Sequence, residues 1–288
     1  MGAYHRPSDL DTALRLLAET GARPLAGGTD LFPADAASTA WGSAGIKQHD
    51  LLDLSGLAEL RQIDTSAERM EIGALVTWSD AIAADLPPWF DAVRQASREV
   101  GGVQIQNRGT LAGNLCNASP AADGAPPLLA LDASVQLTSR SGVRELPLAE
   151  FLEGNRQTAI RPDELLTHIM LPKPPAEARS VFLKLGARRY LVISIAMVAA
   201  TTTLDDAGRI ADIRIAVGAC SAVAQRLPEL EARLEGLTPA AAAADVTADD
   251  LALLEPIDDI RASADYRRHA ALVLIRRALL GEPVMAAA

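Results

Sequence analysis

The chain has 288 residues, a length that allows two or three subdomains rather than a single core. Hydrophobic residues make up 49% and charged residues 22% of it, and its net charge of −10 argues against nucleic acid as a partner. Two cysteines, Cys116 and Cys220, exclude a disulfide scaffold and cannot ligate an iron–sulfur cluster alone. No apolar run is long enough to span a membrane, and no signal peptide is evident, so we expect a cytoplasmic protein.

The N-terminal part predicts one amphipathic helix followed by short strands. Ser8 can cap this helix and Gly21 can end it, with apolar residues at helical spacing between them. The strands that we expect next cover residues 23–26, 50–54, 60–64 and 70–73, and the last two pair with each other.

The middle of the chain mixes helices with a hairpin. Thr77 and Asp80 form a capping box that starts a helix, and a second helix over residues 89–100 ends at Gly101. Further along we expect a helix over residues 126–131, a hairpin of strands 134–139 and 143–147, and a strand over 165–171.

A proline-rich break at residues 172–177 is the best domain boundary in the chain. Strands follow it first and helices afterwards, which is an α+β order. We expect strands over residues 180–187, 193–204 and 210–219, and helices over 227–234, 239–244 and 264–280.

Two segments rich in small residues carry the strongest functional signal. The first covers residues 25–31, and the second, residues 101–123, holds glycines, hydroxyls, amides and a carboxylate with few core-forming side chains. Small side chains let the backbone approach a ligand and point N–H groups at an anion. One Gly-Gly pair alone is more often a strand-to-helix turn. Two such segments predict binding loops that hold a phosphate-bearing cofactor between them.

The other chemically interesting residues give weaker signals. Cys116 has no nearby histidine to activate it, so we interpret it as a small apolar filler. The four histidines lack metal-ligand spacing, so we expect no metal site. Lys184 alternates with leucines on an expected strand, where a solvent-facing lysine is more common than one that faces a cofactor.

Taken together, the motifs at residues 26–31, 105–114 and 118–123 resemble the FAD-binding medium subunit of the molybdenum hydroxylases, the family of xanthine dehydrogenase and carbon monoxide dehydrogenase flavoproteins. The resemblance covers essentially the whole chain. It implies an α+β fold with a two-lobed FAD-binding domain of the vanillyl-alcohol-oxidase (PCMH) type, its lobes at residues 1–55 and 56–174. Residues 175–288 would form a C-terminal α+β domain with a three-stranded sheet and helices.

The resemblance also implies roles for particular residues. Both loops would hold the FAD pyrophosphate, Asp123 would bind sugar hydroxyls, Leu166 would lie near the adenine end, and Lys184 near the flavin ring, where a cation could stabilise the reduced flavin. No catalytic residue is certain. Ala112, where many members have glycine, and Gly124 depart from the family pattern. The residues assigned to the pyrophosphate are Ala26, Gly27, Gly28, Thr29, Asp30 and Leu31 in the first loop, and Thr110, Gly113 and Asn114 in the second.

The implied function is electron transfer by FAD within a larger enzyme. A large partner subunit would carry the molybdenum cofactor and a small one two [2Fe–2S] clusters, in a dimer of heterotrimers. Electrons would pass from the clusters to FAD and then to NAD⁺, O₂ or another acceptor. The alternatives are a stand-alone FAD-dependent oxidase or reductase of the same fold, and an assembly subunit that has lost its flavin.

Overall fold

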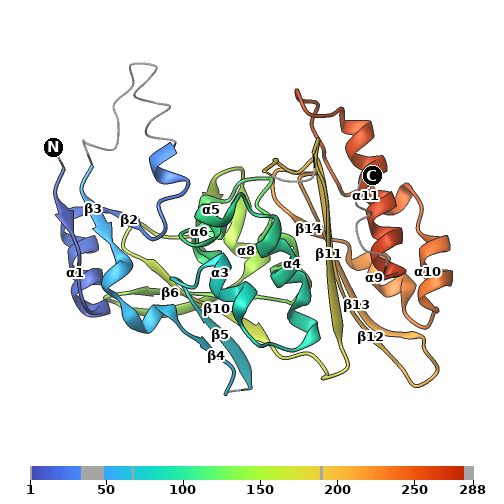
Figure 1. The fold of residues 1–288 in the computed structure, drawn as a ribbon, viewed down its shortest axis with the longest axis horizontal. Coiled ribbons are helices and arrows are strands. Elements are labelled where there is room, and N and C mark those ends of the chain that lie inside the picture. Colours follow the sequence, from blue (N-terminus) through green and yellow to red (C-terminus); the bar gives the residue numbers. More distant parts are fainter. Residues whose placement is uncertain (1, 34–48, 67, 189–190, 282–288) are drawn as a thin grey trace.

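The computed structural model describes residues 2–33, 49–66, 68–188 and 191–281. Three parts follow one another along the long axis of the molecule: an N-terminal lobe, a middle lobe and a C-terminal part (Figure 1). Each part has its own sheet, and the chain is mixed α and β throughout, as predicted.

The N-terminal lobe is a three-stranded parallel sheet, in the order β1-β3-β2, covered by one helix. The helix caps on Asp9 rather than on Ser8 as predicted, because the Asp9 carboxylate accepts the Thr12 N–H at 2.8 Å. Gly21 ends the helix in a left-handed conformation, as expected. The elements are β1 (Tyr4–His5), α1 (Leu10–Thr20), β2 (Arg23–Leu25) and β3 (Leu51–Asp53).

The middle lobe contains a five-stranded antiparallel sheet in the order β4-β5-β10-β6-β7. The predicted hairpin of residues 134–139 and 142–147 is confirmed. The predicted pairing of the first two strands of this lobe, at residues 63–64 and 69–73, is also confirmed. The strand expected over residues 60–64 is shorter, because residues 58–61 form a 3₁₀ turn in which the Leu60 carbonyl accepts the Leu75 N–H. The strands are β4 (Ile63–Asp64), β5 (Arg69–Gly73), β6 (Ser134–Ser139), β7 (Gly142–Pro147) and β10 (Leu165–Pro172).

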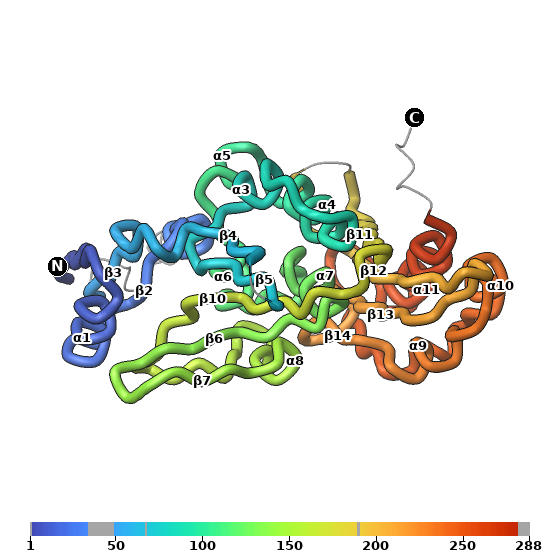
Figure 2. The backbone as a smooth tube through the Cα atoms, turned by 90° about the horizontal axis from the view of Figure 1, so that it is seen from below, coloured from blue at the N-terminus to red at the C-terminus, as the bar shows by residue number. Residues whose placement is uncertain are grey.

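Short helices cover this sheet and form the largest hydrophobic core of the molecule. Figure 2 shows α3, α4 and α5 along one side of the middle lobe and β6, β7 and β10 along the other. The predicted capping box at Thr77 and Asp80 is present. The helices are α3 (Trp78–Ala83), α4 (Asp91–Glu99), α5 (Val103–Gln106), α6 (Leu111–Asn117), α7 (Ala125–Ala130) and α8 (Leu148–Phe151), and a small hairpin follows of β8 (Leu152–Gly154) and β9 (Gln157–Thr158).

The C-terminal part is an antiparallel sheet backed by helices. A short fourth strand joins the three that were predicted, because residues 225–226 pair with the end of β13. The strand expected from residue 193 begins only at Ala196, and Leu191 and Ile193 are exposed. The elements are β11 (Arg179–Leu185), β12 (Ala196–Leu204), β13 (Ile210–Gly218), β14 (Gln225–Arg226), α9 (Pro228–Leu234), α10 (Pro239–Asp245) and α11 (Ala264–Leu279).

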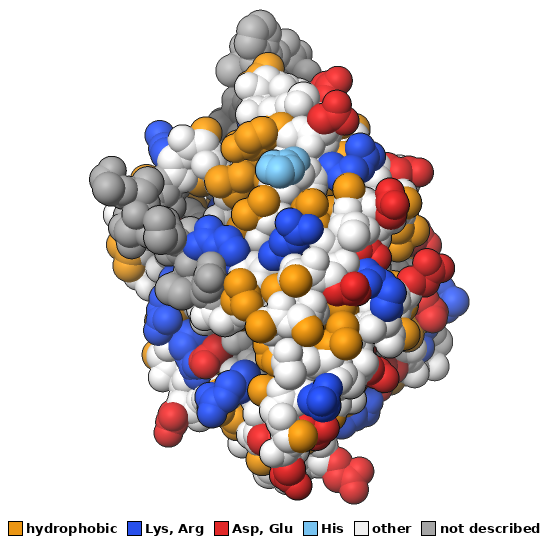
Figure 3. Space-filling view, turned by 90° about the vertical axis from the view of Figure 1, so that its right-hand side faces the viewer, with side chains coloured by type: hydrophobic (Ala, Val, Ile, Leu, Met, Phe, Trp, Pro, Cys, Tyr) orange, Lys and Arg blue, Asp and Glu red, His pale blue; other side chains and the backbone are white. Residues whose placement is uncertain are grey.

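The two faces of this sheet belong to different cores. Phe182 of β11 packs into the middle-lobe core, whereas its neighbour Leu183 packs against the C-terminal helices. Alternate residues of β12 divide in the same way, since successive side chains of a strand point to opposite faces. The sheet therefore packs against the middle lobe with one face and against the C-terminal helices with the other. On the outer face of those helices, apolar and basic side chains are interspersed (Figure 3).

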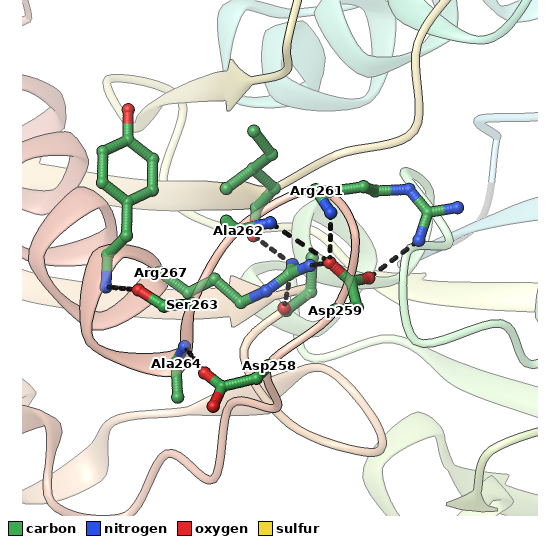
Figure 4. A network of polar contacts seen from close by, with 10 residues as sticks. Asp258, Asp259, Arg261, Ala262, Ser263, Ala264 and Arg267 are labelled. Atoms are coloured by element: carbon green, nitrogen blue, oxygen red, sulfur yellow. Dashed lines mark hydrogen bonds and ion pairs between the residues drawn. The ribbon is translucent and has the colours of Figure 1, made fainter.

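A buried arginine ties the last helix to this sheet. Arg267 of α11 donates to the Ile195 carbonyl at 2.7 Å, to the Ala219 carbonyl at 3.2 Å and to the Asp259 carboxylate at 2.7 Å (Figure 4). The backbone N–H of Arg261 is the strongest of several donors that hold the pKa of Asp259 well below its usual range. The Arg261 guanidinium reaches the same carboxylate from the surface at 2.8 Å.

We expect Arg267→Met to lower the free energy of unfolding by about 3 kcal/mol or more, because two buried carbonyls and a carboxylate lose a charged donor. Arg261→Met is the matched control. It contacts the same carboxylate from an exposed position, so its loss should cost less than about 1 kcal/mol. Urea unfolding of both variants measures the difference, and equal losses would contradict this account of Arg267.

Candidate cofactor site

The first glycine-rich loop lies between β2 and a helical turn that starts at Leu31. Gly28 has a φ of +73°, which side chains rarely adopt, and a Cβ there would lie 2.5 Å from the Phe32 ring. The Gly28 carbonyl accepts the Phe32 N–H at 3.1 Å. The backbone conformation therefore favours glycine at this position, and a side chain there would also displace the exposed Phe32 ring.

The second segment is more structured than predicted. Two short helices, α5 and α6, occupy much of residues 101–123, and Leu111 and Leu115 of α6 are fully buried. The expectation of a long loop without a core role was therefore wrong, because one face of α6 packs into the middle core. Thr110 caps α6 by accepting the Gly113 N–H at 2.9 Å. A β-bridge to Thr77 holds this cap in place.

The structure brings the two segments into direct backbone contact. A Cβ on Gly27 would lie 2.0 Å from the Arg108 carbonyl oxygen, and one on Gly109 would lie 3.2 Å from the Thr29 hydroxyl. At the other end of α6, the Asn117 amide donates to the Asp30 carboxylate at 3.1 Å. The first loop therefore runs alongside α6 from its start to its end.

Several backbone donors of the first loop remain available. None of the hydrogen bonds between described residues uses the N–H groups of Gly27, Gly28 or Thr29. These residues are only partly buried, so the N–H groups lie near the surface beside α6. Clustered backbone N–H groups in a glycine-rich turn are a suitable environment for a phosphate group.

A second contact joins α6 to the loop that carries Asp123. The Asn114 side-chain oxygen accepts the Gly124 N–H at 3.1 Å. A Cβ on Gly124 would lie 2.8 Å from that oxygen and 2.8 Å from the buried Trp78 ring. The departure from the family pattern at Gly124 is thus matched by close packing on that residue.

Asp123 and Lys184, which were predicted separately, form one buried ion pair. The Lys184 ammonium donates to Asp123 Oδ2 at 2.6 Å and reaches the Glu99 carbonyl at 3.4 Å. The Ser194 hydroxyl donates to Asp123 Oδ1 at 2.7 Å. Lys184 is 9% exposed, so the solvent-facing position that the strand pattern favoured was wrong. Burial raises the pKa of Asp123, and Lys184 and Ser194 oppose that rise.

The remaining predicted residues take different positions. Leu166 is buried in the middle core together with Leu111 and Leu115 of α6, so it reaches the site only through that core. Cys116 is exposed, and the interpretation as a core filler was wrong, because α6 directs Leu115 inward and Cys116 outward. Protein nevertheless surrounds its thiol closely enough to raise the pKa to about 12 through desolvation.

Sequence reasoning missed three residues that complete the arrangement. Ser194 is the only hydroxyl in an apolar stretch before β12, and that isolation was the available signal. Asn117 and Arg156 gave no signal, because their bond joins α6 to a turn 39 positions away, with the Arg156 guanidinium 2.6 Å from the Asn117 oxygen.

The two halves of the chain match two family models. Residues 1–174 match the FAD binding domain in molybdopterin dehydrogenase, and residues 182–281 match the CO dehydrogenase flavoprotein C-terminal domain. Together with the two-lobed fold and paired glycine loops, these matches define a flavoprotein component of an oxidoreductase. More particularly, the chain belongs to the family of FAD-binding medium subunits of molybdenum hydroxylases.

Relatives and solved structures agree over nearly the full chain. The chain is 33% identical to the nicotine 6-hydroxylase medium subunit of Paenarthrobacter nicotinovorans, covering 96% of this chain and 95% of that protein. It is 32% identical to the carbon monoxide dehydrogenase medium chain of Afipia carboxidovorans, covering 96% and 94%. A reconstituted CO dehydrogenase structure from Oligotropha carboxidovorans matches with a TM-score of 0.89 at 29% identity, covering 97% and 96% of the two chains.

Two kinds of structural feature are absent from the described residues. No helix among them has the length and hydrophobicity needed to cross a bilayer. Likewise, no group of three or more histidine, cysteine, aspartate or glutamate side chains in the described ranges is arranged to hold a metal ion.

We expect Gly27→Ala to lower the free energy of unfolding by about 1–3 kcal/mol, because the added methyl group must separate two backbones that touch. Gly102→Ala is a suitable control, since its Cβ would make only ordinary contacts at 3.4 Å. Thermal and urea unfolding measure both. If Gly27→Ala were as stable as the control, the close approach of the two loops would be refuted.

Proposed function

We propose that this chain is the electron-transfer flavoprotein subunit of a heteromeric molybdenum hydroxylase and that FAD binds along α6 between the two loops. The observation that carries the proposal is the backbone contact between Gly27 and Arg108, which places two glycine-rich segments at one site. The match of residues 1–174 to an FAD binding domain supports it.

The residues present fit FAD. The free N–H groups of the first loop suit a pyrophosphate. Farther along, the Asp123 carboxylate keeps acceptor capacity beyond the bonds from Lys184 and Ser194, which suits sugar hydroxyls. The exposed apolar side chains of Leu191 and Ile193 lie in the segment that leads to Ser194 and suit a flavin ring.

We assign the roles accordingly. Residues 26–31 with Thr110, Gly113 and Asn114 would hold the pyrophosphate, Asp123 the sugar hydroxyls, and Leu166 would support the adenine end through the core. Lys184 would lie near the ring, where its charge is largely balanced by Asp123, so its main task is to orient that carboxylate. When bound, FAD supplies a redox centre that exchanges one or two electrons.

The proposed partners carry the rest of the chemistry. Relatives are named medium subunits or medium chains, which marks them as components of larger assemblies. We propose a large subunit with the molybdenum cofactor, a small subunit with two [2Fe–2S] clusters, and a dimer of heterotrimers. This chain would accept electrons from the small subunit and deliver them to NAD⁺, O₂ or another acceptor.

Matched glycine substitutions test the cofactor site. Gly28→Ala should weaken FAD binding at least about tenfold, because it strains the loop and its methyl group meets Phe32. Gly208 in the β12–β13 turn has the same backbone conformation, with a φ of +72°, but open space around it. Gly208→Ala should therefore impose the same backbone strain without a steric clash, and it should keep the FAD affinity.

Fluorescence titration of the flavin-free chain with FAD measures these affinities. If the wild-type chain failed to bind FAD, the proposed function would be wrong. If Gly28→Ala and Gly208→Ala bound it equally, the assignment of the first loop would be wrong while the function stood.

Co-purification separates the assembly subunit from the stand-alone enzyme. We expect the chain, expressed with its genomic neighbours, to elute with two further subunits and to show substrate-dependent flavin reduction only in that complex. Rapid mixing of the reduced complex with NAD⁺ or with O₂ identifies the acceptor. Turnover of an organic substrate by the isolated flavin-loaded chain would instead favour a stand-alone oxidase or reductase.

A further inference from the structure

Ser194 is a buried hydroxyl at the meeting point of the middle lobe and the C-terminal sheet. We propose that Ser194 is a positioning residue for the cofactor site, whose hydroxyl keeps the Asp123 carboxylate ionised and oriented to accept hydroxyls of a bound polyhydroxyl chain. This inference rests on the proposed FAD site and adds a residue that the glycine motifs do not contain.

The geometry gives the carboxylate one fixed orientation. Lys184 donates to Oδ2 at 2.6 Å and Ser194 donates to Oδ1 at 2.7 Å, so each oxygen has its own donor. An ionised carboxylate has about four acceptor positions on its two oxygens. Two donors from the protein therefore fix the plane of the group and leave positions for ligand hydroxyls.

Two hydrogen bonds of the next residue, Ile195, fix the backbone around Ser194. The Ile195 N–H donates to the Leu185 carbonyl at 2.7 Å, which attaches this segment to the strand that carries Lys184. The Ile195 carbonyl accepts from the buried Arg267 at 2.7 Å. Ser194 itself is only 2% exposed, so its hydroxyl has little freedom to turn away from Asp123.

The charged surroundings of Asp123 explain why a neutral hydroxyl matters. Lys184 of β11 is the charged partner of Asp123, and the Glu99 main-chain carbonyl of α4 accepts from the same ammonium. The Asn114 side-chain oxygen of α6 accepts the Gly124 N–H, and no hydrogen bond between described residues joins the Asn114 amide to Asp123. Burial opposes the ionised form of Asp123, so each donor to its oxygens contributes to keeping the charge.

Protonation of Asp123 at low pH should weaken FAD binding. Ionised Asp123 binds the ligand hydroxyls and Lys184, so FAD affinity should be full above the pKa of Asp123 and fall as the pH drops through it. Without the Ser194 hydroxyl the ionised form loses a donor and this pKa rises. The acid limb of FAD binding should therefore move to higher pH in Ser194→Ala, by about one pH unit for the loss of one charge-assisted hydrogen bond.

Ser180→Ala is the matched control for this test. Ser180 lies on strand β11 and is 9% exposed. Its hydroxyl donates to the Trp89 carbonyl at 2.7 Å and accepts the Ala92 N–H at 2.8 Å, without touching Asp123. Ser180→Ala removes one buried hydroxyl from this sheet, and Ser194→Ala removes one from the segment just before β12. Both should therefore lose some stability, while only Ser194→Ala changes FAD affinity and its pH profile.

The experiment is a fluorescence titration of the flavin-free full chain with FAD between about pH 5 and pH 8. We expect Ser194→Ala to bind about tenfold more weakly near the acid limb and to show the shifted profile, and Ser194→Thr, which keeps a hydroxyl, to recover most of the affinity. Unchanged binding and an unchanged profile in Ser194→Ala would overturn the inference.

A second variant keeps the test decisive. In Asp123→Asn the group no longer titrates, so the acid limb should disappear, and adding Ser194→Ala should then have little further effect on the profile. If the effects of Asp123→Asn and Ser194→Ala on FAD affinity simply added in the double variant, Ser194 would act independently of Asp123. That result would also overturn the inference. Failure of the wild-type chain to bind FAD at any pH would refute the proposed function instead.

Discussion

The buried ion pair between Asp123 and Lys184 is the interaction on which the arrangement of this molecule depends. Removing two charges from water costs several kcal/mol per ion, and the pair persists only with close geometry and further hydrogen bonds. Here those bonds come from Ser194 and the Glu99 carbonyl. Asp123 belongs to the part of the chain that matches the FAD binding domain and Lys184 to the C-terminal domain. Undocking the C-terminal sheet would therefore leave a carboxylate without its cation beside the candidate site.

The residues that permit this docking are small. On the sheet face toward the middle lobe stand Ala199 and Ala216, and a Cβ on Gly218 would lie 2.8 Å from the Pro126 ring of α7. The opposite face carries Val198 and Ile215, which pack against the C-terminal helices. A larger side chain at Ala199, Ala216 or Gly218 would hold this part of the sheet away from α7, and the ion pair requires a separation of 2.6 Å. Close packing on the face toward the middle lobe thus allows Lys184 to reach Asp123.

Local sequence patterns predicted the elements of this fold well but missed the environment of single side chains. The hairpin of β6 and β7, the capping box at Thr77 and the last helix follow from turn chemistry and periodicity, which depend on near neighbours. Lys184 looked solvent-exposed, because its partner Asp123 lies 61 positions away and leaves no trace in the strand pattern. The interpretation of Cys116 was wrong for another reason. No helix was predicted over residues 111–117, so the spacing of Leu111 and Leu115, which marks the buried face of α6, was not recognised.

In the candidate site, too, sequence motifs identify some residues, whereas others can be identified only from contacts in the structure. The glycines at positions 27 and 28 and at 109 and 113 could be found from composition, because close approach requires small residues wherever it occurs. Gly124 is one of the two departures from the family pattern. In the structure its missing side chain leaves room for Trp78, which is 2% exposed and also lies beside Gly109. The volume lost at Gly124 is therefore filled by a residue 46 positions earlier, and the two must be considered as one packing unit. A departure from a family motif is informative only together with the residue that occupies the space it opens.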